Sequence, residues 1–536
     1  MKIVIIGGVA GGATAAARIR RLDEYAEITV FERSGYVSYA NCGLPYYIGD
    51  VITDPEKLTL QTPENFFKRF RINMKIHHEV ISIHPDCKTV TVKNLANDEI
   101  FEENYDKLIL SPGAKPTQPK LQGAGIDKLF TLRTVEDTFR IKEYINKSHP
   151  KSAVLAGGGF IGLELAENLR ELGMEVTIVQ RPKQLMNPFD WDMASMIHNE
   201  MRKHGIKLVL GYTVEGFKEK DNGVEILLKD NPSLHADMVV LAIGVTPDTA
   251  LAKEAGLELG IKGSIIVNDR METSVPDIYA AGDAVQVKHY VTGNDALISL
   301  AGPANKQGRI IADNICGGDS RYLGSQGSSV IKVFDMTAAT TGINETNAKK
   351  SGLEVDTVIL SPMSHAGYYP GGKVMTMKVV FEKETYRLLG TQIIGYEGVD
   401  KRIDVLATAI HAGLKATQLK DLDLAYAPPY SSAKDPVNMA GFMIDNIAKG
   451  TLKQWHLEDM DKISKDKNAV LLDVRTVGEF SRGHINGFKN IPVDELRERI
   501  NEVEKGKPVY LICQSGLRSY IASRILEGNG YETYNF

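Results

Sequence analysis

The sequence predicts a multidomain α/β protein in which two βαβ units precede a separate α+β domain and a short C-terminal α/β unit. Three observations support this fold class. A glycine-rich strand-helix-strand pattern occurs twice, strands alternate with a helix from about residue 323 to 442, and a charged segment then precedes a new strand, AVLLDVRT. At 536 residues the chain is too long for one core and should hold three or four domains.

The first unit opens the chain with the strand KIVIIGG, the helix ATAAARIRRL and the strand EITVFER. In a dinucleotide-binding turn the first glycine permits the bend, the second lets backbone approach a pyrophosphate, and the third lets the helix pack on the strand. Here these positions are Gly7, Val9 and Gly12, so Val9 departs from the pattern. Glu32 ends the second strand where a ribose hydroxyl would be held, and Asp283 follows far downstream in YAAGDA. A glycine-rich turn of another α/β fold is the alternative.

The second unit repeats the pattern as SAVLAGGG, FIGLELAENLRELG and EVTIVQR. It matches fully at Gly157, Gly159 and Gly162, which predicts a pyrophosphate site at a helix N-terminus. Gln180 ends the second strand in place of an acid. Because an amide neither chelates a ribose nor repels a 2′-phosphate, the choice between NADH and NADPH stays open; NADH is favoured, with NADPH tolerated.

Two strand-glycine segments, YDKLILSPGAKP and ADMVVLAIGVTPDT, are the expected crossings between the two nucleotide-binding lobes. A linker is expected where the composition turns charged after NIAKGTLKQW. The predicted domains are 1–112 with 246–322 for the first nucleotide, 113–245 for the second, 323–443 for the α+β domain, 444–462 for the linker and 463–536 for the last unit.

Composition excludes several classes of partner. A net charge of −5 gives no global reason to expect nucleic acid or an anionic membrane as a partner, and no apolar stretch approaches the ~20 residues of a membrane span. The N-terminus enters a strand at once, so a cytoplasmic location is expected. Four cysteines without C-x2-C spacing argue against both a disulfide scaffold and a zinc site; they are Cys42, Cys87, Cys316 and Cys513.

Cys42 lies in SYANCGLPYYIGD with no second cysteine near it. A dithiol redox pair would read C-x4-C, but the position five residues on is Tyr47. Chemistry at this site must therefore run through a mixed disulfide or an oxidised sulfur on Cys42 itself. Cys87 and Cys316 have no such context and are expected to be structural.

Two nucleotide units in this order, the segment TSVPDIYAAGDA and a C-terminal α+β domain together resemble the two-dinucleotide-binding-domain flavoprotein reductases. The resemblance implies FAD in the first unit, NAD(P)H in the second and a homodimer formed through the α+β domain. It also implies a flavin beside Cys42, and we expect this flavin and the adjacent helix terminus to lower the pKa of the thiol.

Within this group the single-cysteine members divide into NADH peroxidases or oxidases and coenzyme A disulfide reductases. The former carry a catalytic histidine in the first glycine loop, whereas this loop has Ala10 and no histidine. The context S-Y-A-N-C-G-L-P-Y-Y-I-G is similar to the coenzyme A disulfide reductases. By that resemblance Tyr368 and Tyr426 would reach Cys42 from the other subunit; packing at the interface is the alternative.

A coenzyme A substrate carries phosphates, which need cations. Arg18 and Arg21 lie at i and i+3 on one face of the first helix, where a solvated charged face is the alternative. Arg71 falls next to the family's basic position, which Phe70 occupies here. The resemblance adds four further coenzyme A contacts: Thr14, Ser38, Asn41 and Lys434.

The last unit reads LLDVRTVGEFSRGHINGF and then VYLICQSGLRS, with Cys513 at the head of a C-x4-R-S loop between a strand and a helix. Such a loop turns backbone N–H groups toward the sulfur and favours an anion there. These elements resemble rhodanese, in which Arg518 would close the loop and Asp473 and Arg475 would brace it. A phosphatase loop is the rival, but it needs five residues between cysteine and arginine and this one has four.

Together these features predict an enzyme that passes electrons from NAD(P)H through FAD to a sulfur bonded to Cys42. Its expected substrates are coenzyme A persulfide, polysulfide and coenzyme A disulfide, with release of hydrogen sulfide and coenzyme A, while the rhodanese unit handles sulfane sulfur at Cys513. The alternatives are an NADH oxidase or peroxidase and a redox-sensing sulfur-carrier protein.

Overall fold

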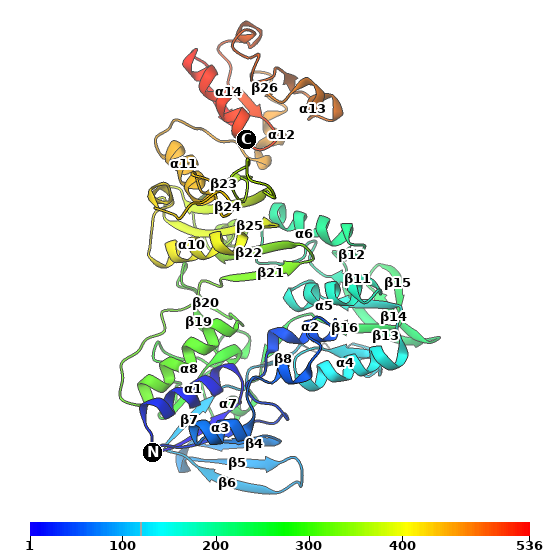
Figure 1. Cartoon of the computed structure of the whole chain (residues 1–536), viewed down its shortest axis with the longest axis vertical. Helices are drawn as coiled ribbons and strands as arrows, with labels where there is room; N and C mark the ends of the chain where they lie inside the picture. The colour runs from blue at the N-terminus through cyan, green and yellow to red at the C-terminus, as the bar shows by residue number, and fades with distance from the viewer. Residues whose placement is uncertain (118–120) are drawn as a thin grey trace. The chain divides into compact units, whose positions relative to one another are not determined.

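The computed structural model describes residues 1–117 and 121–536 (Figure 1). The chain divides into two compact units, Met1–Met336 and Thr337–Phe536. Parallel sheets with flanking helices dominate the first unit, and the second combines an antiparallel sheet with a small parallel one. The predicted α/β fold class is confirmed.

The first parallel sheet of unit one has the strand order β18-β7-β1-β2-β3. Its central strand is nearly all buried, as expected of an apolar run with helices on both faces. Helices α1 and α8 pack against each other beside it. These elements are β1 (Lys2–Ile6), α1 (Ala10–Leu22), β2 (Glu27–Phe31), β3 (Asn73–Lys75), β7 (Lys107–Leu110), β18 (Ile278–Ala280) and α8 (Ala301–Ile315).

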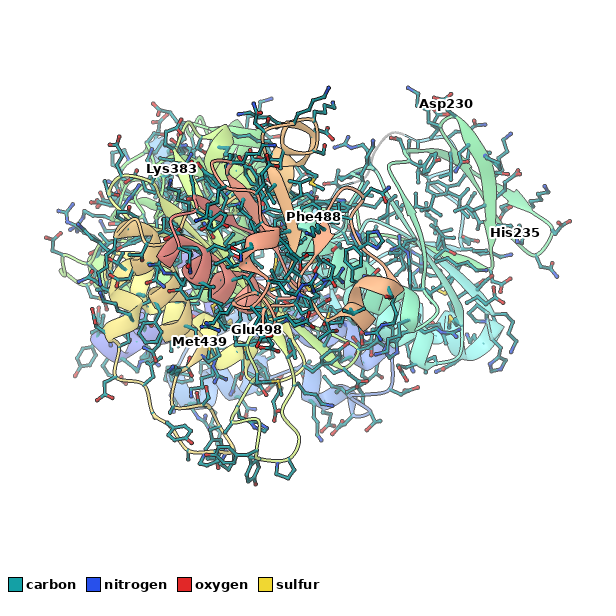
Figure 2. All side chains as sticks on the ribbon, turned by 90° about the horizontal axis from the view of Figure 1, so that it is seen from above. Asp230, His235, Lys383, Met439, Phe488 and Glu498 are labelled. Carbon is teal, nitrogen blue, oxygen red and sulfur yellow. The ribbon has the colours of Figure 1, made fainter. Side chains whose placement is uncertain are left out.

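The second parallel sheet has the order β12-β11-β10-β16-β9, and an antiparallel sheet, β13-β14-β15, follows β12 in the chain. Asp230 and His235 mark the hairpin between β14 and β15 (Figure 2). The elements are β9 (Leu129–Thr131), α4 (Val135–Ser148), β10 (Ser152–Ala156), α5 (Phe160–Glu171), β11 (Glu175–Gln180), α6 (Trp191–Lys203), β12 (Lys207–Leu210), β13 (Val214–Lys220), β14 (Gly223–Leu228), β15 (Asn231–Ala236) and β16 (Met238–Leu241).

The two parallel sheets are joined by an antiparallel pair, β8 with β17, that comes from the two strand-glycine segments. The other elements of unit one are α2 (Leu44–Ile48), α3 (Pro63–Phe70), β4 (His78–His84), β5 (Thr89–Asn94), β6 (Ile100–Asn104), β8 (Ala114–Pro116), β17 (Val245–Pro247), α7 (Ala250–Glu254), β19 (Val287–Lys288), β20 (Asp295–Ala296) and β21 (Ser329–Val333). Short 3-10 turns, η1 to η5, lie between them, and η1 (Asn41–Gly43) carries Cys42.

Unit two begins with an antiparallel sheet in which β22, β25, β24 and β23 are neighbours in that order. Strand β25 is buried along its whole length, which places the core of this part beneath α10. The elements are β22 (Met336–Gly342), α9 (Glu345–Lys350), β23 (Val355–Leu360), β24 (Met375–Glu382), β25 (Leu388–Gly395), α10 (Val399–His411), η6 (Ala416–Asp421) and α11 (Pro436–Ala448).

The C-terminal part of unit two is a four-stranded parallel sheet, β27-β26-β28-β29, with its own apolar core. A second cluster stacks Trp455 on Phe488, the latter labelled in Figure 2. The elements are η7 (Leu457–Asp459), α12 (Met460–Ile463), β26 (Val470–Asp473), α13 (Val477–Arg482), β27 (Lys489–Asn490), η8 (Ile500–Glu502), β28 (Val509–Ile512), α14 (Leu517–Gly528) and β29 (Thr533–Asn535).

The segment predicted as a linker, 444–462, contains the end of α11 and two short helices. Within unit two this segment contacts both the antiparallel sheet and the C-terminal parallel sheet. The side-chain amide of Gln454 donates to the carbonyl of Thr357 at 3.1 Å, and the backbone N–H of Trp455 donates to the carbonyl of Asn535 at 3.0 Å. His456 lies 3.0 Å from Asp356 of β23. This connection is therefore fixed by specific contacts, and the domain boundaries remain predictions.

Within residues 1–117 and 121–536, no helix combines the length and the apolar character that a membrane crossing requires.

Candidate functional site

The first glycine turn is closed by contacts that exclude side chains. Gly7 has φ +98°, and a Cβ there would lie 2.1 Å from the Ser111 carbonyl oxygen. A Cβ on Gly12 would lie 1.9 Å from the Gly7 carbonyl oxygen, so α1 packs directly on the turn. Val9 is the N-cap residue of α1 and makes no side-chain cap hydrogen bond. The helix N-terminus is thus free to bind an anion.

The second turn repeats this geometry. Gly157 has φ +124° and approaches the Ala242 carbonyl, while a Cβ on Gly162 would lie 2.1 Å from the Gly157 carbonyl oxygen. Gly159, the N-cap of α5, has no atom within 4 Å of the position that a Cβ would take. That open space before a helix N-terminus fits the pyrophosphate of a dinucleotide.

Glu32 and Gln180 occupy matching positions and fix the loops through the same type of contact. The Gly8 N–H donates to Glu32 Oε2 at 2.9 Å, and the Gly158 N–H donates to Gln180 Oε1 at 3.0 Å. Glu32 is almost fully buried and also accepts the Ser34 N–H. Both residues therefore hold the glycine that directly follows the first motif glycine of their loop, a structural role that the sequence analysis missed.

Asp283 pairs with a cation that the sequence analysis did not single out. Arg133, which directly precedes α4, places Nη2 2.7 Å from Asp283 Oδ2. Both side chains are partly buried, and both charges act on Cys42. The local signal was weak, because Arg133 lies in a loop with no recognisable motif.

Cys42 lies in the 3-10 turn η1, directly before α2. The residue is exposed, yet its thiol is partly desolvated, which raises its pKa; the Glu164 carboxylate raises it further and Arg133 acts in the opposite direction. The protein groups around Cys42 thus raise the pKa of its thiol on balance, and the lowering that we expect from a neighbouring flavin and helix terminus stays a prediction.

Glu164 is a titratable group beside Cys42 that the sequence analysis missed. Burial and the neighbouring Glu167 raise its pKa to about 7, while a hydrogen bond from Tyr46 opposes the shift. Burial raises the pKa of Tyr46 to about 12. Helix α5 carries Glu164 and packs closely on α2, since a Cβ on Gly49 would meet Asn168 at 2.1 Å. The site thus holds a carboxyl that changes charge near neutral pH.

The predicted coenzyme A contacts of the first helix differ in availability. Arg18 is in an ion pair with Asp313 at 2.7 Å, so its charge is compensated in this structure, whereas Arg21 is exposed. The Thr14 hydroxyl donates to Asn305 Oδ1 at 2.7 Å. Arg18 therefore has a carboxylate partner in this structure and Arg21 is exposed, while the roles of both at coenzyme A stay predictions.

Three further predicted contacts lie elsewhere in unit one. Asn41 neighbours Cys42 in η1, and Ser38 has a left-handed backbone with φ +48° just before it. Arg71 ends α3 in the left-handed region and stacks over Phe67 at 5.2 Å. Asn41 and Ser38 share the loop of the reactive thiol, and Arg71 lies on α3.

Tyr368 and Tyr426 are brought together in unit two. Their hydroxyl oxygens are 2.7 Å apart, and their side chains are 76 % and 45 % exposed. The hydrogen bond that Tyr426 shares with Tyr368 raises the pKa of Tyr426. Lys434 is exposed on the loop that follows Tyr426. An exposed pair of hydrogen-bonded phenols is poorly explained by core packing.

The buried guanidinium of Arg402 connects the two tyrosine-bearing loops. Its Nη2 donates to the carbonyl of Ser364 at 2.9 Å, to Ser431 Oγ at 3.1 Å and to Asp435 Oδ2 at 3.0 Å. Arg402 is only 1 % exposed. It therefore acts as a positioning residue behind the phenol pair, and nothing in its sequence context, VDKRIDVL, indicated that role.

Cys513 directly follows β28 and begins a tight loop closed by Gly516, which has φ +88° and caps α14. The Gly516 N–H points at Cys513 Sγ at 3.1 Å, and the Ser519 hydroxyl lies 3.2 Å from the same sulfur. Ser519 is fully buried. The loop thus directs two neutral donors at one sulfur atom, as the C-x4-R-S pattern indicates.

Arg518 does not point freely into the loop but forms a bidentate ion pair with Glu479 of α13. Its Nη1 and Nη2 lie 2.7 and 2.8 Å from the two carboxylate oxygens. This pair and the hydrogen bonds from Thr476 hold the pKa of Glu479 far below its usual range. The Arg475 guanidinium is likewise held by Asp473, with Nη2 2.6 Å from Oδ2. Glu479 was missed, although it is the acid of the E-F-x-x-G-H-I segment.

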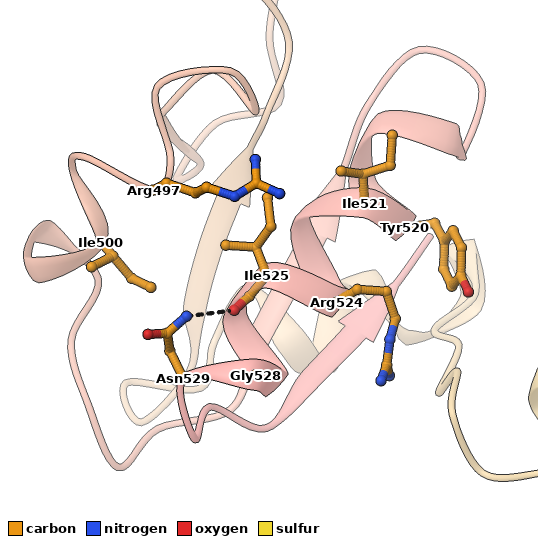
Figure 3. Close-up of a pocket in the computed structure, with 8 residues that line it drawn as sticks. All are labelled: Arg497, Ile500, Tyr520, Ile521, Arg524, Ile525, Gly528 and Asn529. Carbon is orange, nitrogen blue, oxygen red and sulfur yellow. Dashed lines mark hydrogen bonds between the residues drawn. The ribbon is translucent and has the colours of Figure 1, made fainter.

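A shallow pocket of about 600 Å³ opens along α14, away from the cysteine loop (Figure 3). Arg497 and Arg524 flank an isoleucine floor, and Asn529 donates to the Ile525 carbonyl at 2.9 Å. Cys513 is not among the lining residues.

Comparison with known proteins matches every part of this architecture. The family model described as pyridine nucleotide-disulphide oxidoreductase matches residues 1–308, its dimerisation domain matches 328–436, and a rhodanese-like domain matches 456–536. A coenzyme A disulfide reductase of Staphylococcus aureus (strain JH9) is 38 % identical over 442 residues, covering 82 % of this chain and 99 % of the relative.

Two solved structures cover nearly the whole chain. Reduced Bacillus anthracis CoADR-RHD is 48 % identical with a TM-score of 0.97, covering 99 % of this chain and 96 % of the other. A NAD-dependent persulfide reductase from A. fulgidus is 39 % identical with a TM-score of 0.92, covering 100 % and 98 %. The expected architecture of two Rossmann-like domains, a dimerisation domain and a rhodanese domain is confirmed, and the chain belongs to the pyridine nucleotide-disulphide oxidoreductase family.

Proposed function

We propose that this protein is an FAD-dependent NAD(P)H oxidoreductase that reduces coenzyme A persulfide or polysulfide and coenzyme A disulfide through Cys42. The observation that carries the proposal is that Cys42 is the only cysteine of its loop, with Tyr47 where a second would stand, and that three charged groups, Glu164, Arg133 and Asp283, act on it. Two glycine turns of the same unit fit dinucleotides. A single thiol suits a substrate that itself supplies the second sulfur.

The activities for which two similar proteins are named support this substrate class. One curated relative is a coenzyme A disulfide reductase, and a structure that matches along the whole chain is a NAD-dependent persulfide reductase. In this chain Gly7 and Gly12 would hold FAD, and Gly157, Gly159 and Gly162 would hold NAD(P)H. FAD, when bound, supplies a two-electron relay between the nicotinamide and the sulfur.

Cys42 would act as the nucleophile. With a disulfide, its thiolate attacks one sulfur, a mixed disulfide forms, and the first coenzyme A thiolate leaves; two electrons then release the second. With a persulfide, RSSH, the net reaction consumes NAD(P)H and a proton and yields the thiol RSH, hydrogen sulfide and NAD(P)⁺. Arg133 opposes the carboxylates that disfavour the thiolate, and Glu164 can hold or release a proton beside the leaving sulfur.

Coenzyme A binding would use the cations and polar groups near the loop. Arg21 is exposed for a phosphate, and Ser38 and Asn41 neighbour Cys42. We further propose a cytoplasmic homodimer in which the phenol pair Tyr368–Tyr426 of one subunit, together with Lys434, serves Cys42 of the other. The matched dimerisation domain and the exposure of both phenols support this arrangement.

A water-forming NADH oxidase is the second candidate, since the Lactobacillus brevis enzyme of that name is 31 % identical with a TM-score of 0.81. It covers 84 % of this chain, and the first glycine loop here has Ala10 without a histidine. Both facts favour the thiol substrate.

The test is anaerobic NADH oxidation by the purified yellow holoenzyme, with coenzyme A persulfide or disulfide as the acceptor. Cys42→Ser should abolish both activities while FAD stays bound. Cys87→Ser, which changes an exposed thiol in another turn of the same unit, is the matched control and should retain both. Turnover by the Cys42 variant, or equal NADH consumption with oxygen alone, would overturn the proposal.

A sulfur hand-off between the rhodanese domain and coenzyme A is the second part of the proposal. If Cys513→Ser leaves every persulfide-dependent activity unchanged, the hand-off is wrong, while the Cys42 chemistry stands. A large preference for persulfide over disulfide in kcat/KM would indicate sulfide production, and the reverse would indicate thiol-redox maintenance.

A further inference from the structure

Both arginines that the sequence places beside Cys513 are neutralised. Arg518 donates two hydrogen bonds to the two carboxylate oxygens of Glu479, and Arg475 donates from Nε and Nη2 to the carboxylate of Asp473. The loop between Cys513 and Arg518 reads Q-S-G-L and adds no cation. These four charged side chains therefore carry no net charge.

The groups that do point at the sulfur are neutral. They are the Gly516 N–H and the Ser519 hydroxyl, at 3.1 and 3.2 Å. Backbone N–H groups and the N-terminus of the 12-residue α14 favour one negative charge on the terminal sulfur. A second charge on an incoming anion would need a cation to offset the repulsion, because a fixed dipole is weaker than a full charge.

The helix starts beside the loop are apolar. Val477 begins α13 and Leu517 begins α14, and these side chains are 58 % and 64 % exposed. The ion pair between Glu479 and Arg518 links the N-terminal turns of these two helices. Two exposed aliphatic side chains, Val477 and Leu517, at these linked helix N-termini suit a substrate whose thiol-bearing arm is uncharged.

We infer that the Cys513 site takes sulfane sulfur from organic persulfides with an uncharged thiol arm and discriminates against thiosulfate, and that Glu479 sets this specificity by holding Arg518. The inference rests on the proposed function only in that the persulfide of coenzyme A would then be a substrate of this site.

The transfer step balances without a further reactant. Cys513–S⁻ + RSSH → Cys513–S–S⁻ + RSH: the thiolate attacks the outer sulfur, the S–S bond of the persulfide breaks, and the departing thiolate takes up the proton that the outer sulfur gives up. Cyanide as an acceptor restores the thiolate, since Cys513–S–S⁻ + CN⁻ → Cys513–S⁻ + SCN⁻. Thiosulfate would instead release sulfite with its two charges, which no free guanidinium on the loop offsets.

The experiment measures thiocyanate formation by the full-length Cys42→Ser holoenzyme, in which the reductase chemistry is absent. The donors are coenzyme A persulfide, glutathione persulfide and thiosulfate. The wild-type loop should favour the coenzyme A persulfide over thiosulfate by at least about 100-fold in kcat/KM, because the second anionic charge finds no charged partner. Comparable rates with thiosulfate would overturn the inference with no variant needed.

Glu479→Gln then frees Arg518 and keeps the helix cap, because glutamine also serves at that capping position. Thiosulfate kcat/KM should rise about tenfold or more, since a bond to a charged partner is gained, while the persulfide rate changes little. Glu495→Gln is the matched control: it removes another glutamate–arginine ion pair of the same domain, with Arg499, and should alter neither rate. An unchanged thiosulfate rate in Glu479→Gln would refute the role of Glu479.

Arg482, which ends α13, provides the remaining check. Arg482→Ala should leave both rates unchanged, and loss of thiosulfate turnover would instead assign the specificity to Arg482. If no variant transfers sulfur from a persulfide while the protein with Cys42 intact still carries out NADH-dependent reduction, this inference is wrong and the proposed function is unaffected.

Discussion

Replacing Glu164 by Gln should increase the reactivity of Cys42. The carboxylate of Glu164 raises the pKa of the thiol, and its own pKa of about 7 means that it is about half ionised at neutral pH. A neighbouring like charge shifts a pKa by roughly one unit or more, which is about 1.4 kcal/mol. Gln keeps the shape and can still hydrogen-bond Tyr46, so the packing of α5 on α2 should survive.

The assay is the rate of iodoacetamide alkylation of Cys42 against pH, followed by peptide mass in a Cys513→Ser background. The rate at pH 7.5 should rise by up to about tenfold in Glu164→Gln, because each pKa unit is a factor of ten in thiolate. The gain should shrink toward pH 6, where Glu164 becomes protonated in the parent protein.

Glu171→Gln is the matched control, since Glu171 is exposed at the end of the same helix and is not among the charges that act on Cys42. An equal rate in parent and Glu164→Gln at every pH, or a gain that is the same at pH 6 and pH 8, would refute the electrostatic account of this site.

Three other predictions follow from packing and charge. Arg402→Leu should cost about 3–5 kcal/mol in urea unfolding, because it removes the buried cation of Asp435 and leaves only Lys401, 3.9 Å away, beside that buried carboxylate; a loss below about 1 kcal/mol would contradict the buried pair. Gly157→Ala should weaken NAD(P)H binding by about tenfold in a fluorescence titration with FAD content unchanged, since the turn needs positive φ; equal affinity would count against the second cradle. Asp356 raises the pKa of His456, so protonation stabilises this contact, and the stabilisation should fade as pH rises above 6.5; a thermal midpoint in His456→Gln that differs from the parent equally at pH 6 and pH 8.5 would exclude the pair.

The fold was readable from the sequence because its signals are local. Glycine turns at Gly7 and Gly157 need positive φ, and no other residue adopts that backbone at little cost. Continuous apolar runs such as KIVII predict strands buried on both faces, and the structure has them so.

The site was only partly predictable, because long-range pairing decides which charges are free. Arg18 lies on a helix face that suits a phosphate, yet Asp313 of α8 neutralises it. Arg518 reads as a loop-closing cation, but Glu479, 39 residues away, holds it. Periodicity within one element carries no information about a partner in another.

The electrostatics of Cys42 show the same limit. A flavin and a helix terminus beside the thiol suggested a low pKa, and the sequence did not show that partial burial and Glu164, which helix α5 brings close, act in the opposite direction. Desolvation depends on what packs above a loop, which composition and spacing do not encode.

The most direct test of the account is the mass of the Cys42 peptide after the oxidised holoenzyme reacts anaerobically with coenzyme A disulfide in the absence of NADH. We predict one coenzyme A in disulfide linkage on Cys42 per chain, which one equivalent of NADH releases. No adduct on Cys42 in an enzyme that still turns the disulfide over, or an adduct on Cys513 alone, would contradict a reductase that works through one thiol.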